Sequence, residues 1–193
     1  MQNIVYFLLF AYLLGSIPFG LLFVKMAGRG DIRNIGSGNI GTTNVLRTGS
    51  KWLALATLFA DFFKGMIPLV IIKWVGAPVL DQVWVAGAAV IGHVFPIWLR
   101  FKGGKGVATA LGTFIGIMPI LGVAVAGIWV ALAVLTRISS LSALVAFLSG
   151  PLLAYLLAAP DAIIGYCMGI SLLIIWTHRS NIRRLSGGEE KRF

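Results

Sequence analysis

Long apolar stretches fill most of the chain and leave only short polar segments between them. Three of them, residues 4–26, 52–74 and 79–99, are each long enough to cross the roughly 30 Å hydrocarbon core of a bilayer as a helix. Of the 193 residues, 59% are hydrophobic and 11% are charged, and a soluble domain usually carries about twice that charged share. The sequence therefore predicts an all-α fold, a polytopic membrane bundle that forms a single integral-membrane domain over residues 1–193.

The distribution of basic residues decides how many spans there are. Residues 107–135 can form one long kinked span or two short ones, 107–117 and 120–135, and spans at 140–158 and 162–176 follow. With two short spans, fourteen of the sixteen lysines and arginines lie on the same side of the membrane. Because cytoplasmic loops collect positive charge, we predict seven transmembrane helices with the N-terminus outside and the C-terminus in the cytoplasm.

Two of the predicted spans depart from a regular helix. Gly-Ser-Ile-Pro at residues 15–18 interrupts the first span, because proline frees a carbonyl group and bends the helix. No basic segment or clear cleavage site marks this span as a signal peptide, so we expect it to be retained. The span at 107–117 is too short to cross the membrane unaided at 1.5 Å per residue. We expect it to be sheltered in the bundle, with its N-terminal end in a polar cavity.

Ionisable residues inside an apolar span are costly and usually face the interior of a bundle. Asp61 and Lys64 are three residues apart in the second span, so they lie on one helical face. We interpret them as an ion pair, with a structural role favoured over direct contact with a substrate. The one cysteine, Cys167, lies in an apolar run and is expected to be a small core residue.

The formal charge of +10 favours anionic substrates or anionic lipid headgroups. Nucleic acid is not expected as a partner, because the chain has no basic soluble domain. Carboxylates on the predicted cytoplasmic side are few, namely Asp31, Glu189 and Glu190. A two-metal phosphotransferase needs several acidic ligands, so we expect neither a metal nor another cofactor.

Residues 35–47 read Ile-Gly-Ser-Gly-Asn-Ile-Gly-Thr-Thr-Asn-Val-Leu-Arg, which suits a phosphate-binding loop. Glycines let backbone N–H groups approach a ligand, and a helix that starts after them adds a partial positive charge. We expect a short helix over 41–46 with Asn39 as its N-cap and Gly49 as its stop. The segment nearly matches two nucleotide-binding motifs, but no strand precedes it and Thr42 stands where a Walker loop needs lysine. A plain polar loop between spans is an equally weighted alternative.

Two further polar segments fall on the same predicted face. Lys102 to Gly106 reads Lys-Gly-Gly-Lys-Gly before a predicted helix and again joins backbone N–H groups to a point charge, Lys105. His178 and Asn181 are three residues apart at the end of the last span, so we expect one helical face to present both. Each segment alone is explained by topology or lipid contact. Their convergence on one membrane face favours a site for phosphorylated ligands.

These motifs resemble those of the bacterial acyl-phosphate-dependent glycerol-3-phosphate acyltransferases, the PlsY family. The matching segments are Gly-Ser-Gly-Asn-Ile-Gly-Thr-Thr-Asn-Val-Leu-Arg at 36–47, Gly-His-Val-Phe-Pro at 92–96 leading into Phe-Lys-Gly-Gly-Lys-Gly-Val-Ala-Thr at 101–109, and His-Arg-Ser-Asn-Ile-Arg-Arg-Leu with Gly-x-Glu at 178–189. The similarity covers nearly the whole chain. It implies transfer of an acyl group from acyl phosphate to sn-glycerol 3-phosphate, giving 1-acylglycerol 3-phosphate and inorganic phosphate, without acyl-CoA and without a covalent acyl-enzyme.

The resemblance also suggests roles for individual residues. Ser37, Arg47 and Lys105 would hold the phosphate of glycerol 3-phosphate, with Asn39 and Thr43 in support. The residues expected to hold the acyl phosphate are Thr42, Gly103, Gly104 and Gly106. The candidates for catalysis are His178 and Asn181, which would orient the attacking hydroxyl, together with Ser37.

The resemblance implies an enzyme of phospholipid synthesis in the cell inner membrane, with its active site facing the cytoplasm. Its expected partners are acyl phosphate, glycerol 3-phosphate and membrane lipids, and the enzyme that makes acyl phosphate is a further candidate. A transporter for a phosphorylated metabolite is the competing class, supported by the broken spans and the Asp61–Lys64 pair. Alternating-access sites lie near mid-membrane, however, whereas the polar segments of this chain gather at one face. A lipid-binding scaffold is a third alternative.

Overall fold

The computed structural model describes residues 4–192, and these residues form helices and connecting loops without any strand. The α-helices are α1 (Ile4–Ser16), α2 (Phe19–Met26), α3 (Thr42–Leu46), α4 (Lys51–Trp74), α5 (Val79–Val94), α6 (Val107–Ile117), α7 (Pro119–Thr136), α8 (Ser139–Leu148), α9 (Gly150–Leu156), α10 (Asp161–Thr177) and α11 (Arg179–Ser186). Two short 3-10 helices, η1 (Ile32–Asn34) and η2 (Ile97–Leu99), lie in the loops. The predicted all-α fold is confirmed for these residues.

Five helical segments of the described chain are long and apolar enough to span a bilayer: Ile4–Met26, Lys51–Trp74, Val79–Leu99, Pro119–Thr136 and Ser139–Leu156. A sixth is obtained when α10 and α11, which meet at a 63° bend, are counted as one span. Helix α6 is apolar but has only 11 residues. The predicted boundaries agree with these helices within a few residues, while the count of seven spans and the orientation of the termini stay predictions.

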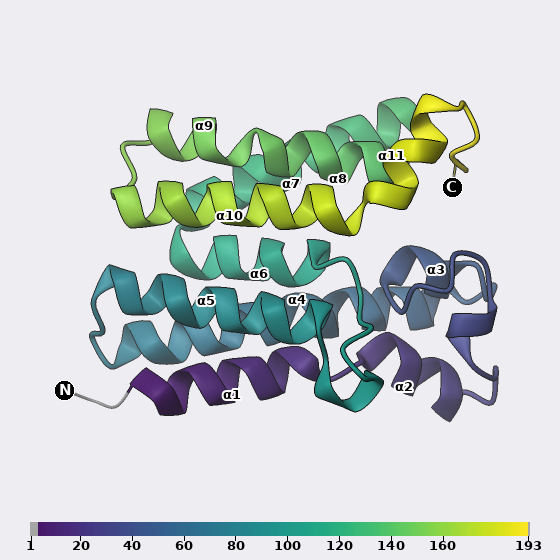
Figure 1. Cartoon of the computed structure of the whole chain (residues 1–193), viewed down its shortest axis with the longest axis horizontal. Helices are drawn as coiled ribbons and strands as arrows, with labels where there is room; N and C mark the ends of the chain where they lie inside the picture. Colours follow the sequence, from purple (N-terminus) through teal and green to yellow (C-terminus); the bar gives the residue numbers. More distant parts are fainter. Residues whose placement is uncertain (1–3, 193) are drawn as a thin grey trace.

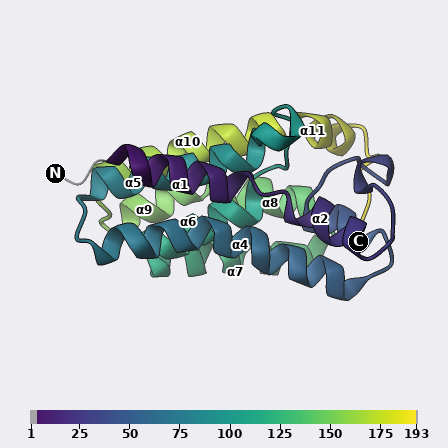
Figure 2. The same ribbon diagram turned by 90° about the horizontal axis from the view of Figure 1, so that it is seen from below.

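The long helices run side by side, and α6 lies between two groups of them (Figure 1). One group is α1, α4 and α5, and the other is α7 to α10; α6 contacts α4, α5 and α7. Figure 1 shows α2, α3 and α11 with the C-terminus at one end of the bundle, and Figure 2 shows α2 and α11 at that end from a second direction. At the C-terminal end of α6, Lys73 of α4 donates to the carbonyl oxygens of Gly116 and Ile117, both at 3.1 Å, so these helix-end carbonyls have a partner within the bundle. The predicted shelter of the short helix is therefore confirmed.

Small residues allow the closest helix contacts. A Cβ atom added to Gly15 of α1 would clash with the Ala89 carbonyl of α5, and one added to Gly112 of α6 would clash with the Phe62 carbonyl of α4. In a membrane, where apolar burial drives little association, such close backbone packing is a main source of helix–helix attraction.

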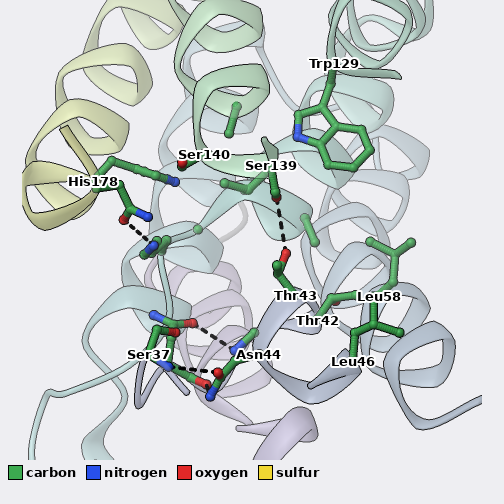
Figure 3. A pocket seen from close by; sticks show the side chains of 18 of the residues that line it. Ser37, Thr42, Thr43, Asn44, Leu46, Leu58, Trp129, Ser139, Ser140 and His178 are labelled. Atoms are coloured by element: carbon green, nitrogen blue, oxygen red, sulfur yellow. Dashed lines mark hydrogen bonds between the residues drawn. The ribbon is translucent and has the colours of Figure 1, made fainter. Parts of the chain in front are cut away.

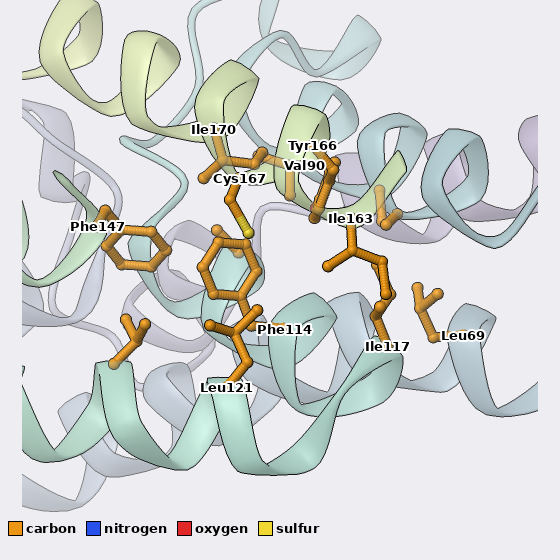
Figure 4. Close-up of a cluster of buried hydrophobic side chains, with 14 of the residues drawn as sticks. Leu69, Val90, Phe114, Ile117, Leu121, Phe147, Ile163, Tyr166, Cys167 and Ile170 are labelled. Carbon is orange, nitrogen blue, oxygen red and sulfur yellow. The ribbon is translucent and has the colours of Figure 1, made fainter. Parts of the chain in front are cut away.

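The apolar centre of the bundle is built around Phe114 of α6 (Figure 4). Its ring packs on Phe147 and Tyr166, with ring centroids 5.4 and 5.8 Å apart. The hydroxyl group of Tyr166 finds a partner in Thr113 at 2.7 Å, as a buried polar group requires. Cys167 is buried beside these rings, which confirms its predicted place in the core.

The buried ion pair is also confirmed. Lys64 Nζ lies 2.6 Å from Asp61 Oδ1, as a contact between charges rather than a directed hydrogen bond, and both residues are 2% exposed. Lys64 also donates to the Ile17 carbonyl at 2.9 Å. That carbonyl lies at the break between α1 and α2 next to Pro18, so the lysine stabilises the predicted interruption. His93 Nδ1 lies 3.7 Å from the same Asp61 oxygen.

Two local predictions were wrong. The cap of α3 is Gly41, and the Asn39 side chain instead accepts a hydrogen bond from the Gly41 N–H at 2.8 Å, so Asn39 shapes the turn before the helix. Helix α10 ends at Thr177 and the chain bends at His178. His178 and Asn181 therefore do not belong to one continuous helix with the last span, although both line the same cavity.

Candidate active site

A cavity of about 580 Å³ lies near the end of the bundle that carries α3 and α11 (Figure 3). One part of its wall is polar and comes from the three segments singled out in the sequence. The other part is apolar and comes from α4, α6, α7 and α8, including Leu58, Leu111, Val125, Ala126, Val130 and Phe147. Leu58 and Val130 are 39% and 53% exposed, so the apolar part of the wall is accessible from outside the protein.

The cavity brings together nine of the eleven predicted site residues. These are Ser37, Asn39, Thr42, Thr43, Arg47, Lys105, Gly106, His178 and Asn181. The three sequence segments therefore meet in one place. The other two residues, Gly103 and Gly104, do not line the cavity.

Gly103 and Gly104 form a turn whose N–H groups are already bonded. Gly103 donates to the Val94 carbonyl at 3.0 Å, and Gly104 donates to the His93 carbonyl at 3.1 Å. A side chain at Gly104 would clash with the His93 ring. The glycines thus let the loop pack on the end of α5, and the expectation that they present N–H groups to a ligand is corrected. The backbone N–H groups that remain available to a ligand are those at the start of α6, where Gly106 and Val107 line the cavity.

Asn44 organises the loop that contains Ser37, a role that no sequence pattern indicated. Its Oδ1 accepts the Ser37 N–H at 3.0 Å, and its Nδ2 donates to the carbonyls of Ile32, Ile35 and Asn39 at 3.1, 2.8 and 2.8 Å. Asn44 is only 2% exposed. One amide side chain therefore provides most of the cross-links that keep the glycine-rich loop in shape.

Lys105 is a half-buried cation of the site. Its ammonium group donates to Asn181 Oδ1, and Thr177 donates to the Lys105 carbonyl at 3.1 Å. Burial lowers the pKa of Lys105 to about 8, an effect that Glu190 opposes and that Arg184 and Arg47 reinforce. The lysine is mostly charged at neutral pH and loses its charge in mildly alkaline solution.

His178 is neutral at physiological pH. Burial, together with nearby Lys105, lowers its pKa to about 4. Its Nδ1 lies 2.9 Å from the Ile174 carbonyl, and because a carbonyl oxygen only accepts, Nδ1 carries the proton. The other ring nitrogen, Nε2, is left as a hydrogen-bond acceptor.

Two contacts that no sequence pattern indicated close the cavity wall. Thr43 Oγ1 lies 3.2 Å from Ser139 Oγ at the start of α8, which links the first loop to the second half of the bundle (Figure 3). Glu190, beyond α11, accepts from Ser140 at 2.7 Å and from Arg184 at 2.6 Å, and also from Asn181. No periodicity marks these residues in the sequence, because their role depends on how the C-terminal segment folds back.

Comparison with known proteins agrees with the geometry. The model of the family glycerol-3-phosphate acyltransferase matches residues 5–188. A glycerol-3-phosphate acyltransferase of Rhizobium meliloti (strain 1021) is 50% identical over 187 residues, which cover 96% of this chain and 90% of the relative. One of Allorhizobium ampelinum is 51% identical over 185 residues, covering 94% and 88%.

Two solved structures have the same fold. The crystal structure of PlsY (YgiH), an integral membrane glycerol 3-phosphate acyltransferase, in its glycerol 3-phosphate form has a TM-score of 0.93 and 39% identity, covering 98% of this chain and 95% of that one. Its lysophosphatidic acid form has a TM-score of 0.91 and 38% identity with the same coverage. The chain therefore belongs to the glycerol-3-phosphate acyltransferase family.

Proposed function

We propose that this acyltransferase uses acyl phosphate as its donor and acylates the 1-hydroxyl group of sn-glycerol 3-phosphate. The products are 1-acylglycerol 3-phosphate (lysophosphatidic acid) and inorganic phosphate, and the reaction is the first acylation of phospholipid synthesis. One observation carries the proposal: a single cavity joins a basic, polar part to an apolar part, and three helical segments that are long and apolar enough to span a bilayer help to line the apolar part. A phosphorylated molecule with a long acyl tail requires both.

The proposed reaction is a direct transfer. The 1-hydroxyl oxygen of glycerol 3-phosphate attacks the acyl carbon, a new ester C–O bond forms, and the bond between the acyl carbon and the phosphate oxygen breaks. The hydroxyl proton leaves with the released phosphate, either directly or by way of His178. Because phosphate is a good leaving group, no covalent enzyme intermediate is needed, and positioning together with charge stabilisation provides most of the rate.

The residues divide into two groups in this proposal. Ser37, Arg47 and Lys105 bind the phosphate of glycerol 3-phosphate, and Asn39 and Thr43 support them. Thr42 and the N-terminal end of α6 at Gly106 bind the acyl phosphate. Gly103 and Gly104, which were expected to share this role, are left out because their N–H groups are already bonded. A helix N-terminus is suited to an anion, because its first N–H groups are unpaired.

The arrangement in the membrane is part of the same proposal. The chain crosses the inner membrane seven times, with its N-terminus outside and the cavity open to the cytoplasm, where glycerol 3-phosphate is dissolved. The basic residues support this orientation, because those that line the cavity, among them Arg47 and Lys105, lie at the end of the bundle predicted to be cytoplasmic. The enzyme that makes acyl phosphate is the proposed protein partner.

A turnover assay in detergent tests the proposal. Purified protein is mixed with acyl phosphate and glycerol 3-phosphate, and released phosphate and lysophosphatidic acid are measured. We expect both products in equal amounts, and no ester product when acyl-CoA replaces acyl phosphate. Because transport needs a closed compartment, turnover in detergent would also exclude a pure transporter. Acylation from acyl-CoA alone would contradict the proposed donor.

A further inference from the structure

A carboxylate in the polar wall of this cavity calls for an explanation, because both proposed substrates are anions. The side chain of Glu190 is only 9% exposed and lines the cavity together with Lys105 and Arg184. Its two oxygens accept hydrogen bonds from three different side chains, those of Ser140, Arg184 and Asn181. Its neighbour Glu189 is exposed and is not among the lining residues. Glu190 is therefore held in a fixed place by a set of donors.

The amide of Asn181 stands between Glu190 and Lys105, and only one of its two orientations fits. A carboxylate can only accept hydrogen bonds and an ammonium group can only donate them. The NH₂ group of Asn181 therefore faces Glu190, and its carbonyl oxygen faces Lys105. If the amide turned over, its NH₂ group would point at the ammonium group and its oxygen at the carboxylate. Asn181, only 4% exposed, is occupied by these two partners.

We propose that Glu190 is a positioning residue that acts on Lys105 through Asn181, by fixing the amide so that its carbonyl oxygen receives the ammonium group. This inference rests on the proposed function, in which Lys105 binds the phosphate of glycerol 3-phosphate. It assigns Asn181 to holding the lysine, in place of the predicted role of orienting the attacking hydroxyl. It also makes the segment after α11 part of the site, since Glu190 ties that segment to Ser140 of α8.

The charges around Lys105 support this role. Arg47 at the end of α3 and Arg184 of α11 lower the pKa of Lys105, and Glu190 raises it. His178 is neutral and adds no charge at physiological pH. Lys191 and Arg192 line the same cavity and add further positive charge nearby. Glu190 therefore provides the negative charge that helps Lys105 stay protonated, as well as the acceptor that orders Asn181.

Glu190→Gln tests the proposal, with Glu189→Gln as the matched control. The glutamine amide of this variant can donate to the Asn181 oxygen, so the Asn181 amide is no longer locked, and the negative charge is lost. At pH 7.5 we expect the KM for glycerol 3-phosphate to rise about tenfold or more, the equivalent of one lost hydrogen bond to a charged group. The alkaline limb of the pH–rate profile should move to lower pH. In Glu190→Asp the alkaline limb should lie between those of Glu190→Gln and the wild type. Glu189→Gln should match the wild type.

A measurement on the lysine itself separates this inference from the proposed function. The lysines are ¹³C-dimethylated, the NMR signal of Lys105 is identified by its loss in Lys105→Arg, and its titration is followed in the wild type and in Glu190→Gln. A lower midpoint in Glu190→Gln supports the proposal, even if the wild type does not turn over acyl phosphate. An unchanged midpoint overturns it. The proposal is also overturned if Glu190→Gln melts at a lower temperature but keeps the wild-type KM and the wild-type alkaline limb of the pH–rate profile. Glu190 would then only anchor the segment after α11.

Discussion

The imidazole of His178 donates its Nδ1 proton to the carbonyl oxygen of Ile174, 2.9 Å away in the last turn of α10. This contact fixes the tautomer and leaves Nε2 as a hydrogen-bond acceptor at the cavity, where the 1-hydroxyl group of glycerol 3-phosphate would bind. A buried neutral imidazole that lines a site with Lys105 is suited to accept a proton or to orient a hydroxyl group.

We predict that His178→Ala lowers kcat by about 10²- to 10⁴-fold, the range for loss of a general base. Since the pKa of His178 is lowered to about 4, the imidazole is neutral at any pH well above 4. The wild-type pH–rate profile should therefore show no acid limb from this histidine near pH 6.5. Stopped-time assays of released phosphate between pH 5 and pH 9 check both points. A wild-type kcat in the variant would rule out the general-base role and leave the proton to the departing phosphate.

The charge of Lys105 should set the alkaline limit of activity. Its pKa is lowered to about 8, so the ammonium form, which is the form proposed to bind phosphate, is present below that pH and is lost as the pH rises through it. We expect Lys105→Met to be almost inactive or to have a much higher KM for glycerol 3-phosphate. Lys105→Arg stays charged at every accessible pH, so whatever activity it keeps should persist at pH 9. A normal KM in Lys105→Met would contradict the phosphate-binding role.

The sequence predicted the helices well because periodicity and length largely determine them. The short helix α6 was expected at residues 107–117 and begins and ends there. Glycine and proline marked the interruption before Phe19 equally clearly. The buried pair of Asp61 and Lys64 followed from spacing alone, since two charges in an apolar helix must neutralise each other.

The parts of the site that the sequence did not predict depend on tertiary contacts. Gly103 and Gly104 have the composition of a phosphate loop, but their N–H groups are used to pack on α5. Asn44 looked like one more polar residue in its loop, and only the fold shows that four backbone groups depend on it. Glu190 enters the site because the chain turns back after α11, a path that no local pattern specifies.

Breaking the buried ion pair should be more damaging than removing it. Asp61→Leu or Lys64→Met alone leaves one uncompensated charge in a site that is 2% exposed, a loss of about 3–5 kcal/mol. The double variant leaves no charge and should recover most of that loss. Thermal unfolding in detergent compares the three variants. If the double variant is stable but has lost turnover, the pair contributes to the reaction as well as to the fold.

Close packing of α6 against α4 should make Gly112 intolerant of a side chain. A Cβ atom there would clash with the Phe62 carbonyl, so we expect Gly112→Ala to destabilise the protein by about 1–3 kcal/mol. Gly127 of α7 is the matched control, because nothing lies within 4 Å of a Cβ atom at that position. Gly127→Ala should be neutral or slightly stabilising, since alanine is the better helix former. Equal melting temperatures for the two variants would mean that α4 and α6 can separate without loss.

Asn44 provides the sharpest test of the first loop, because its replacement changes the loop without removing any group proposed to touch substrate. Asn44→Ala leaves the Ser37 N–H and three carbonyls without their partner, and we expect a higher KM for glycerol 3-phosphate together with a lower melting temperature. Asn44→Asp should be worse than alanine, since a carboxylate would face the three carbonyl oxygens. Asn34, which is exposed, is the control, and Asn34→Ala should leave both quantities unchanged. An Asn44→Asp variant with the wild-type KM would show that the loop keeps its shape without the amide, and that binding of glycerol 3-phosphate does not depend on where Asn44 holds Ser37.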